Sequence, residues 1–268
     1  MGRLEGKVAI VTGAGSSGPG VGTGKATAIL FAKEGAKVLL VDLNEQAALE
    51  TLSEIISENG TASVFKCDVT SAKDCENMAN AGMSEYGRID ILFNNVGISG
   101  PGSTTDVQED VWDRVLNINL KSMMLTSKYV VPKMIETGGG SIINISSIVG
   151  LRSGGGSPSI PYAASKGGVI ALTKSMAVQL GRDNVRVNCI APGHIYTPMV
   201  GGKMTPAMRE KRKTAGPLGT EGNAWDIAWA NVFLASEESR WISGITMPID
   251  AGLLAATPLS VYDDIRSE

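Results

Sequence analysis

The sequence predicts an α/β fold in which one parallel sheet of about seven strands carries helices on both faces. Two observations support this prediction. Short apolar runs rich in Val and Ile alternate with segments of helical periodicity along the whole chain. Aromatic residues make up only 5% of a chain that is 43% hydrophobic, so burial must come from small aliphatic side chains. Both observations are typical of a doubly wound sheet whose strands are buried on both faces.

The expected strands are short apolar runs that end at a turn or an acidic residue. The run 7–12 is apolar between its end residues and leads into a glycine-rich turn. The run 37–42 ends at Asp42, which closes the second strand. The other strands are expected at 62–66, 89–93, 141–145, 185–190 and 245–249.

The expected helices lie between these strands. Gly35 is well placed to end the first helix, and Ser71 to cap the third. Thr205-Pro206 predicts the start of a further short helix. The irregular segments 99–106 and 194–223 remain, and we expect the longer one to be a substrate lid of a single domain spanning 1–268. The main helices are expected at 25–34, 46–59, 71–86, 111–136, 162–180 and 224–235.

Composition excludes several classes of function. The net charge is −3 and the pI is about 5.4, with no basic stripe, which argues against a nucleic-acid partner. The N-terminus has no apolar signal region, and no apolar run reaches the ~18 residues of a membrane helix. Three cysteines without paired spacing and a single histidine favour a reduced, cytoplasmic protein with no metal site.

A glycine-rich turn follows the first expected strand. Gly13 ends that strand, and Gly22-Thr23-Gly24 opens the first helix. Glycines let the backbone approach a pyrophosphate, while the helix N-terminus points free N–H groups at its charge. A glycine pattern taken alone is equally compatible with a flexible turn.

Acidic residues end the next two strands and give the turn its context. Asp42 lies about 20 residues beyond the glycines, where a carboxylate can accept both ribose hydroxyls and repel a 2′-phosphate. An acid at this position favours NAD over NADP as the cofactor, and it is typical of a Rossmann fold. Capping of the next helix is the alternative role for Asp42. Asp68 ends the third strand with Val69 beside it, and either contacts adenine or simply makes a turn.

Tyr162 and Lys166 are separated by one turn of an expected helix. A nearby ammonium favours a phenolate, so we expect Lys166 to lower the pKa of Tyr162 from about 10. A tyrosine tuned in this way is suited to general acid–base work on an alcohol or a carbonyl. By itself, such a pair is more often part of a solvated helix face.

Together these motifs resemble the classical short-chain dehydrogenase/reductase family, over nearly the whole chain from Lys7 to Gly252. The resemblance implies a catalytic tetrad of Asn119, Ser147, Tyr162 and Lys166, with Ser147 preferred over Ser146. It also implies an NAD site and a homotetramer. The motifs that carry it are Thr12-Gly13-Ala14 with Gly22-Thr23-Gly24, Asp68, Asn94-Asn95-Val96-Gly97, Asn119, Ser147, Tyr162-x-x-x-Lys166 and Pro192-Gly193.

The resemblance assigns further residues to the cofactor and the substrate. The substrate is expected to meet Ser147, His194, Met199 and Met204, although a loop histidine is more often structural. The cofactor-binding residues are expected to be Gly13, Gly22, Thr23, Gly24, Asp42, Asp68, Val69, Asn95, Val96, Gly97, Tyr162, Lys166, Pro192, Gly193, Ile195 and Thr197.

Three features depart from the family pattern. The glycine turn is about five residues longer than usual, so it is open which of Gly15, Gly18 or Gly20 touches phosphate. Val96 stands where alanine is common, which suggests a packing change. Ser147 and Tyr162 are about two residues further apart than usual, which should reshape the wall of the substrate pocket between Gly154 and Pro161.

The resulting hypothesis is an NAD-dependent oxidoreductase that acts on a secondary alcohol or its ketone. Tyr162 would exchange the proton, Lys166 would lower its pKa and hold the ribose, Ser147 would bind the substrate oxygen, and Asn119 would bind a water. Asn119 has an alternative role in repairing a helix kink, and Ser147 in capping a strand end.

Other functions stay open from the sequence. They are a non-catalytic NAD(H) sensor or scaffold, an NADP-dependent carbonyl reductase such as a 3-oxoacyl reductase, and an epimerase or dehydratase. Low charge in the expected pocket hints at a neutral substrate. The cations Lys203, Arg209, Lys211, Arg212 and Lys213 suit either an acidic substrate tail or, more commonly, a solvated helix face.

Overall fold

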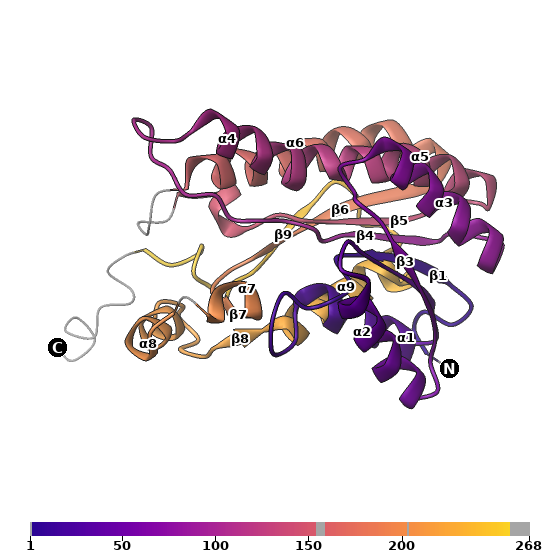
Figure 1. Ribbon diagram of the computed structural model, residues 1–268, viewed down its shortest axis with the longest axis horizontal. Helices are drawn as coiled ribbons and strands as arrows, with labels where there is room; N and C mark the ends of the chain where they lie inside the picture. Colours follow the sequence, from indigo (N-terminus) through magenta and orange to yellow (C-terminus); the bar gives the residue numbers. More distant parts are fainter. Residues whose placement is uncertain (1, 154–158, 203, 258–268) are drawn as a thin grey trace.

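The predicted parallel sheet is present, and helices cover both of its faces (Figure 1). The computed structural model describes residues 2–153, 159–202 and 204–257. Every described pair of neighbouring strands is parallel, in the order β3-β2-β1-β4-β5-β6-β9. The strands are β1 (Val8–Thr12), β2 (Lys37–Asp42), β3 (Thr61–Lys66), β4 (Ile91–Asn94), β5 (Gly140–Ile145), β6 (Val185–Pro192) and β9 (Thr246–Ile249).

Helices form a layer on each side of the sheet, as Figure 1 shows. One layer holds α1 (Thr23–Lys33), α2 (Glu45–Ser57) and α9 (Ala224–Ala235), in which α1 packs against both neighbours. The other holds α3 (Ala72–Tyr86), α4 (Glu109–Leu116), α5 (Ser122–Glu136) and α6 (Ile160–Leu180). Buried aliphatic side chains fill the space between each layer and the sheet, so strands such as β1 are buried along their whole length.

The expected helix 111–136 is interrupted. A π-helical turn, η1 (Asn117–Lys121), joins α4 to α5, so the segment is one helical run with a local bulge. The bulge contains the buried Asn119. Single π turns inside helices are frequent at functional sites, because the extra residue re-aims one side chain.

The expected irregular segment 194–223 is more ordered than the sequence suggested. Its two ends pair with each other, because β7 (Ile195–Tyr196) runs parallel to β8 (Gly222–Asn223). Between them lie α7 (Pro198–Gly201) and α8 (Pro206–Thr214). Thr205 caps α8 as predicted, since its hydroxyl accepts the Met208 N–H. The segment therefore forms a closed excursion from the sheet, because the short β7–β8 pair holds its two ends together.

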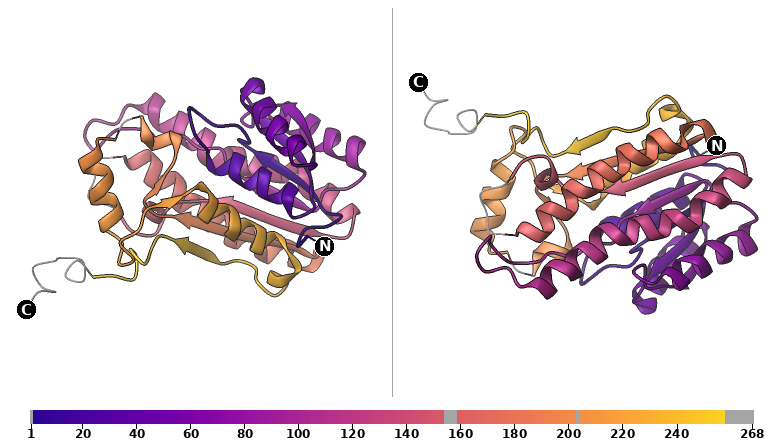
Figure 2. Two further views of the ribbon diagram at one scale, coloured as in Figure 1. Left: turned by 90° about the horizontal axis from the view of Figure 1, so that it is seen from below. Right: turned by 90° about the horizontal axis from the view of Figure 1, so that it is seen from above.

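The excursion lies at the carboxyl ends of the strands. The two views of Figure 2 place α8 and the segment leading to the C-terminus at one end of the sheet, with the N-terminus at the opposite end. Among the described residues, no helix is both long and apolar enough to cross a bilayer. Cys67, Cys75 and Cys189 are buried free thiols.

A chain of buried polar side chains joins two helices of one layer, α5 and α6, to the central strands β4 and β5. The Asn94 amide donates to Asn144 Oδ1 at 2.9 Å, and the Asn144 amide donates to Thr173 Oγ1 at 3.0 Å. Thr126 donates to Asn94 Oδ1 at 2.7 Å. These bonds fix α5 and α6 relative to β4 and β5, and each partner is satisfied only in this register.

Replacing Asn144 with Ala should lower the free energy of unfolding by about 1–3 kcal/mol, because it removes two buried hydrogen bonds and leaves the Asn94 amide with only its longer 3.4 Å bond to Ser127. Urea denaturation would measure this change. Asn80→Ala on the exposed face of α3 is the control, and it should leave the midpoint unchanged. Equal midpoints for the Asn144 variant and the unsubstituted protein would contradict the role given to this chain of hydrogen bonds.

Candidate active site

A cleft of about 1640 Å³ opens at the carboxyl ends of the strands. Single-ligand pockets usually measure about 300–1,000 Å³, so the cleft has room for a dinucleotide together with a second molecule. In the strand order, β1 and β4 are neighbours whose connecting segments go to opposite faces of the sheet. Ligands of open α/β sheets bind at this switch point.

The cleft brings together the site residues that the sequence predicted, apart from Asn119. Asn119 is buried behind the wall of the cleft and does not line it. The predicted residues that line it are Gly13, Gly22, Thr23, Gly24, Asp42, Asp68, Val69, Asn95, Val96, Gly97, Ser147, Tyr162, Lys166, Pro192, Gly193, His194, Ile195, Thr197, Met199 and Met204.

The glycine turn is shaped by one very close backbone approach. Gly13 has φ +64°, and a Cβ on Gly24 would lie 1.9 Å from the Gly13 carbonyl oxygen, so only glycine fits there. Gly22 caps α1 without a side-chain hydrogen bond, which leaves backbone N–H groups of the first turn facing the cleft. This is the arrangement that holds a pyrophosphate.

The lengthened turn lies partly on the cleft and partly against α7. Of the three glycines left open by the sequence, only Gly15 lines the cleft. Gly18 and Gly20 lie against Pro198 at the start of α7. Sequence reasoning missed Ser16, whose hydroxyl accepts the Gly22 N–H at 2.9 Å and lines the cleft. The lengthening therefore joins the turn to the 194–223 segment without widening the phosphate site.

The two strand-end acids are anchored by backbone donors. Asp42 accepts the N–H of Gly15 through Oδ2 and the N–H of Asn44 through Oδ1, both at 2.9 Å. Asp68 Oδ1 accepts the N–H and the hydroxyl of Thr70 at 2.9 and 2.7 Å. Asp68 is thus a turn aspartate, as its alternative reading expected, and it also lines the cleft. Asp42 links the second strand to the glycine turn and does not cap α2, whose cap is Asn44.

Lys166 and Ser146 tie α6 to the end of β5. The buried Lys166 ammonium donates to the Ile145 carbonyl at 2.9 Å, and the Ser146 hydroxyl donates to the Lys166 carbonyl at 2.7 Å. The Lys166 Nζ lies 5.6 Å from the centroid of the Tyr162 ring. Both serines line the cleft, but the Ser146 hydroxyl is held by its bond to Lys166, whereas the Ser147 hydroxyl hydrogen-bonds Tyr162 and also accepts the Val149 N–H at 3.4 Å, as its alternative capping role expected. This difference agrees with the choice of Ser147.

Burial governs the titration of the pair, which differs from the sequence expectation. Burial raises the pKa of Tyr162, and the hydrogen bond from Ser147 opposes this only in part. Burial also lowers the pKa of Lys166 to about 8. Burial acts against the charged form of each group, so the expected fall in the Tyr162 pKa is absent.

Asn119 acts as a clamp behind the site. Its side chain accepts the Ile98 N–H at 2.7 Å and donates to the Ile98 carbonyl at 2.9 Å. It also donates to the Ser165 hydroxyl at 3.0 Å, and Ser165 donates to the Tyr162 carbonyl. The π turn therefore joins the loop after β4 to the helix that carries Tyr162, beyond the kink repair considered from sequence.

His194 is half-buried at the start of the 194–223 segment. Its Nδ1 is a buried atom without a hydrogen-bond partner among the described residues. Burial and the neighbouring Arg212 lower the pKa of this imidazole, so it is neutral at pH 7. The structure places it on the cleft wall, as the sequence expectation required.

The expectation of a cleft with little charge is wrong. Besides Lys166, four cationic side chains line it, from α4, the turn after Ser147 and α8: Arg114, Arg152, Lys211 and Arg212. Sequence reasoning also missed Leu253 and Leu254, which line the cleft after the last strand. That segment carries no motif, and only the return of the chain past α8 brings it there.

Comparison with known proteins places this arrangement in one family. A family model described as enoyl-(acyl carrier protein) reductase, of the short-chain alcohol dehydrogenase group, matches residues 19–254. A 3-oxoacyl-[acyl-carrier-protein] reductase, FabG, of Thermotoga maritima is 40% identical over 94% of this chain and 99% of its own. The 7alpha-hydroxysteroid dehydrogenase of Escherichia coli is 37% identical over 93% of this chain and 95% of its own.

Solved structures agree. A protein from Burkholderia xenovorans, described only as a short-chain dehydrogenase/reductase, superposes with a TM-score of 0.91 at 40% identity, covering 96% of this chain and all of its own. A 7 alpha-hydroxysteroid dehydrogenase complexed with NADH and 7-oxo glycochenodeoxycholic acid gives 0.87 at 37% identity, over 93% of this chain and 95% of its own. With its parallel sheet, glycine turn and Tyr162–Lys166 pair, this chain belongs to the classical short-chain dehydrogenase/reductase family.

Proposed function

We propose that this protein is an NAD-dependent oxidoreductase that moves a hydride between a secondary alcohol, or its ketone, and the nicotinamide. The observation that carries the proposal is the meeting of Ser147, Tyr162 and Lys166 on the wall of a cleft whose other half holds the glycine turn. A sensor that only bound the cofactor would have no use for this acid–base group. The nicotinamide supplies or accepts the hydride.

The side chains would handle the proton and the charge on the substrate oxygen. In alcohol oxidation, Tyr162 removes the hydroxyl proton while the Ser147 hydroxyl hydrogen-bonds the same oxygen. In ketone reduction, Tyr162 returns that proton to the oxygen. Lys166 is protonated below pH about 8, and its ammonium favours the phenolate that oxidation requires. Asn119 acts as a positioning residue by holding the loop after β4 against α6.

Tyr162→Phe should lower turnover by about 10²–10⁴-fold, because it removes the proton-exchanging hydroxyl and keeps the ring. Absorbance near 340 nm with NAD⁺ and a panel of secondary alcohols would measure turnover, and NADH fluorescence would report cofactor binding. Unchanged NADH binding is expected in this variant. Turnover close to that of the unsubstituted enzyme would remove Tyr162 from the mechanism.

The surroundings of Asp42 favour NAD over NADP. The Asp42 carboxylate lines the cleft together with Gly15, Ser16, Leu43 and Asn44. A 2′-phosphate at this place would meet a carboxylate, and none of these neighbours is a cation that could bind it. A 2′-hydroxyl, in contrast, can donate a hydrogen bond to the carboxylate.

Asp42→Ala should narrow the preference for NAD⁺ over NADP⁺ by at least about tenfold, since it removes both the repulsion and the hydroxyl bond. Ratios of kcat/KM for the two cofactors would show it. Asp42→Asn is the matched variant, because its amide oxygen can still accept one backbone N–H without the charge. An unsubstituted enzyme that used both cofactors equally would contradict the ribose contact.

A second candidate function is an NADP-dependent reductase of 3-oxoacyl chains. The observation that favours it is the 40% identity to a 3-oxoacyl-[acyl-carrier-protein] reductase over almost the full length of both chains. Asp42 argues against this candidate, because it disfavours the 2′-phosphate. The cofactor ratios above therefore also separate the two functions.

We also propose that the segment 197–221 is a lid over the nicotinamide and the substrate. Its base is fixed by the β7–β8 pair, while Met199 and Met208 are 48% and 53% exposed. Methionine side chains on a helix that covers a cleft can adapt to ligands of different shape. Gly202 follows α7 and has open space around it, so it can take up a hinge motion, whereas Gly201 ends α7 against Tyr196 and Gly216 is packed against Ala251.

Hydrogen exchange should be fast for the α7 and α8 amides in the free protein and slower when NAD⁺ and a substrate are both bound, because closure excludes water from these helices. Mass spectrometry of peptides from 197–221 would measure the change. Peptides from β5 serve as the control and should be protected in both states. Strong protection of α8 in both states would make the segment a fixed wall.

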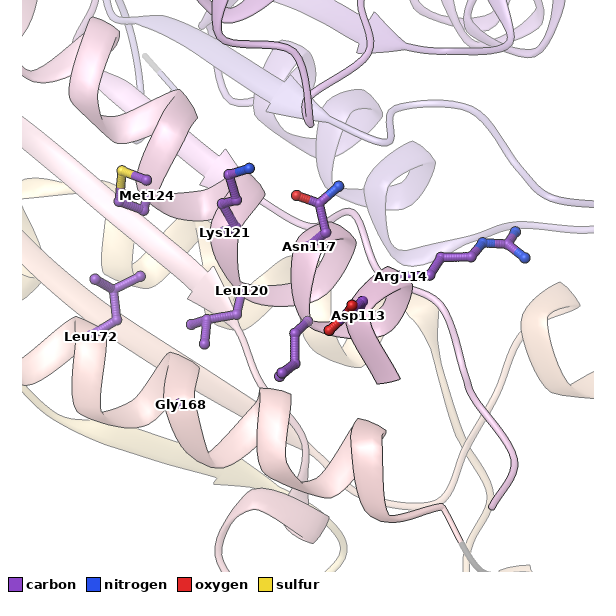
Figure 3. Close-up of a pocket in the computed structure, with 9 residues that line it drawn as sticks. Asp113, Arg114, Asn117, Leu120, Lys121, Met124, Gly168 and Leu172 are labelled. Atoms are coloured by element: carbon purple, nitrogen blue, oxygen red, sulfur yellow. The ribbon is translucent and has the colours of Figure 1, made fainter. Parts of the chain in front are cut away.

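We propose a homotetramer, and the outer face of η1, α5 and α6 is the surface that needs cover. A shallow groove of about 850 Å³ runs along this face. Figure 3 shows Leu120 and Leu172 reaching toward each other across the groove, with Met124 beside them and Gly168 on the neighbouring turn of α6. The apolar stretch that Leu120, Met124 and Leu172 give this groove suits the ridges of a second copy of the same helices, while Asp113, Arg114 and Lys121 supply charges at its border.

Light scattering should therefore give a mass well above 27.9 kDa at micromolar concentration. Leu172→Lys should reduce this mass, because it places a charge in the apolar groove. Ile56→Lys on the exposed face of α2, in the opposite layer, should leave the mass unchanged. A monomer at micromolar concentration would contradict the assembly.

A further inference from the structure

The substrate end of the cleft is basic. Arg152, Lys211 and Arg212, which we call the basic rim, line the cleft around the lid and the turn that follows Ser147. Among the described lining residues, the only carboxylates are Asp42 and Asp68, and both lie at the ends of β2 and β3. The two ends of the cleft thus carry opposite charge.

The cations of α8 are divided between its two faces. Arg209 makes a two-pronged pair with Glu221 at 2.7 and 2.5 Å and stacks on the Tyr196 ring at 3.8 Å. Lys213 pairs with Glu210 at 3.2 Å. These two cations are neutralised outside the cleft, as expected for a solvated helix face.

Lys211 and Arg212 lie on the other face. Both line the cleft, and among the described residues neither forms a salt bridge. Glu221 is the acid that acts on Arg212, but Arg209 already holds both of its oxygens. Arg212 is half-buried, with its guanidinium 3.5 Å from the Ile195 carbonyl. Partial burial disfavours the charge of Arg212 unless an anion enters the cleft, whereas Lys211 is exposed beside it.

The cofactor does not require these cations. Its pyrophosphate has the backbone N–H groups of the glycine turn and the start of α1, and its adenosine has the acidic end of the cleft. Arg152 lies away from these cofactor groups, in the turn that follows Ser147, where its backbone N–H donates to the Ile148 carbonyl. The basic rim therefore faces the second ligand of the cleft.

The wall around the basic rim is apolar. Met208 lines the cleft one turn before Lys211 and Arg212, Met204 lines it just before α8 begins, and Leu253 and Leu254 line it from the C-terminal segment. A ligand that satisfies both parts of this wall has an apolar body and a negative group at one end.

We propose that the basic rim binds a carboxylate carried by an otherwise apolar alcohol or ketone substrate. This inference rests on the proposed function, because it takes the second ligand of the cleft to be the substrate. It replaces the neutral substrate expected from sequence by an amphipathic, anionic one. Lys211 and Arg152 supply the charge that selects it, while Arg212 also supports Ile195 from within the wall.

Binding of dodecanoate and methyl dodecanoate to the protein saturated with NAD⁺ tests the proposal without requiring turnover. Isothermal titration at low salt should show dodecanoate binding about tenfold more tightly than the ester, with the difference shrinking in 0.5 M NaCl. The double variant Arg152→Gln/Lys211→Gln should lose most of this preference. Lys213→Gln, on the outer face of the same helix, should keep it.

Three outcomes would overturn the proposal. They are equal binding of acid and ester, an equal loss of preference in Lys213→Gln, and a loss of NAD⁺ affinity in the double variant, which would assign the cations to the cofactor. The proposed reaction is tested separately. A preserved preference for dodecanoate together with no NAD⁺ reduction on any alcohol would remove the reaction and leave the anion site standing.

Discussion

The rest of the structure depends on one constraint, which is that the chain segments following β1 and β4 leave the sheet in opposite directions. Right-handed crossovers send the segments that follow these neighbouring strands to opposite faces of the sheet, so a crevice must open between them. The Asn95 amide spans its floor, donating to the carbonyls of Thr12 and Gly13 at 3.2 and 3.1 Å. The close contact of Gly24 with Gly13 then sets α1 against that floor. A phosphate site follows from backbone geometry alone.

The proposed catalytic residues Tyr162 and Lys166 depend on the same rigid framework, on the other side of the cleft. Lys166 is bonded to the end of β5, and Asn119 joins the loop after β4 to the helix that carries Tyr162. These bonds hold the Tyr162 phenol and the Lys166 ammonium in the wall of the cleft, where both groups are buried. Because burial raises the pKa of Tyr162 and lowers that of Lys166, the resting pair is less charged than it would be in water. Charge that develops on a substrate oxygen there meets donors already in place.

Charge is divided along the cleft, and this division shapes both specificities that we propose. Asp42 and Asp68 stand where the adenosine half of a dinucleotide would lie, and the unpaired cations stand under the lid. A carboxylate selects against an additional phosphate on the ribose, while unpaired cations select for an anion on the substrate. The lengthened glycine turn touches the lid through Pro198, so the two halves of the cleft are in physical contact.

The sequence by itself determined the fold class, and it pointed to the residues that we propose for the site, because strand periodicity, glycine spacing and strand-end acids are local signals. The strands lie within about two residues of their expected positions, and the predicted motifs line one cleft. The tertiary structure alone decided what depends on distant contacts. Burial reversed the expected pKa shift of Tyr162, and packing split the cations of α8 between ion pairs and the cleft. Leu253 entered the wall only because the chain returns past the lid. The burial of a side chain and the meeting of distant segments depend on residues far apart in sequence, so no local sequence pattern predicts them.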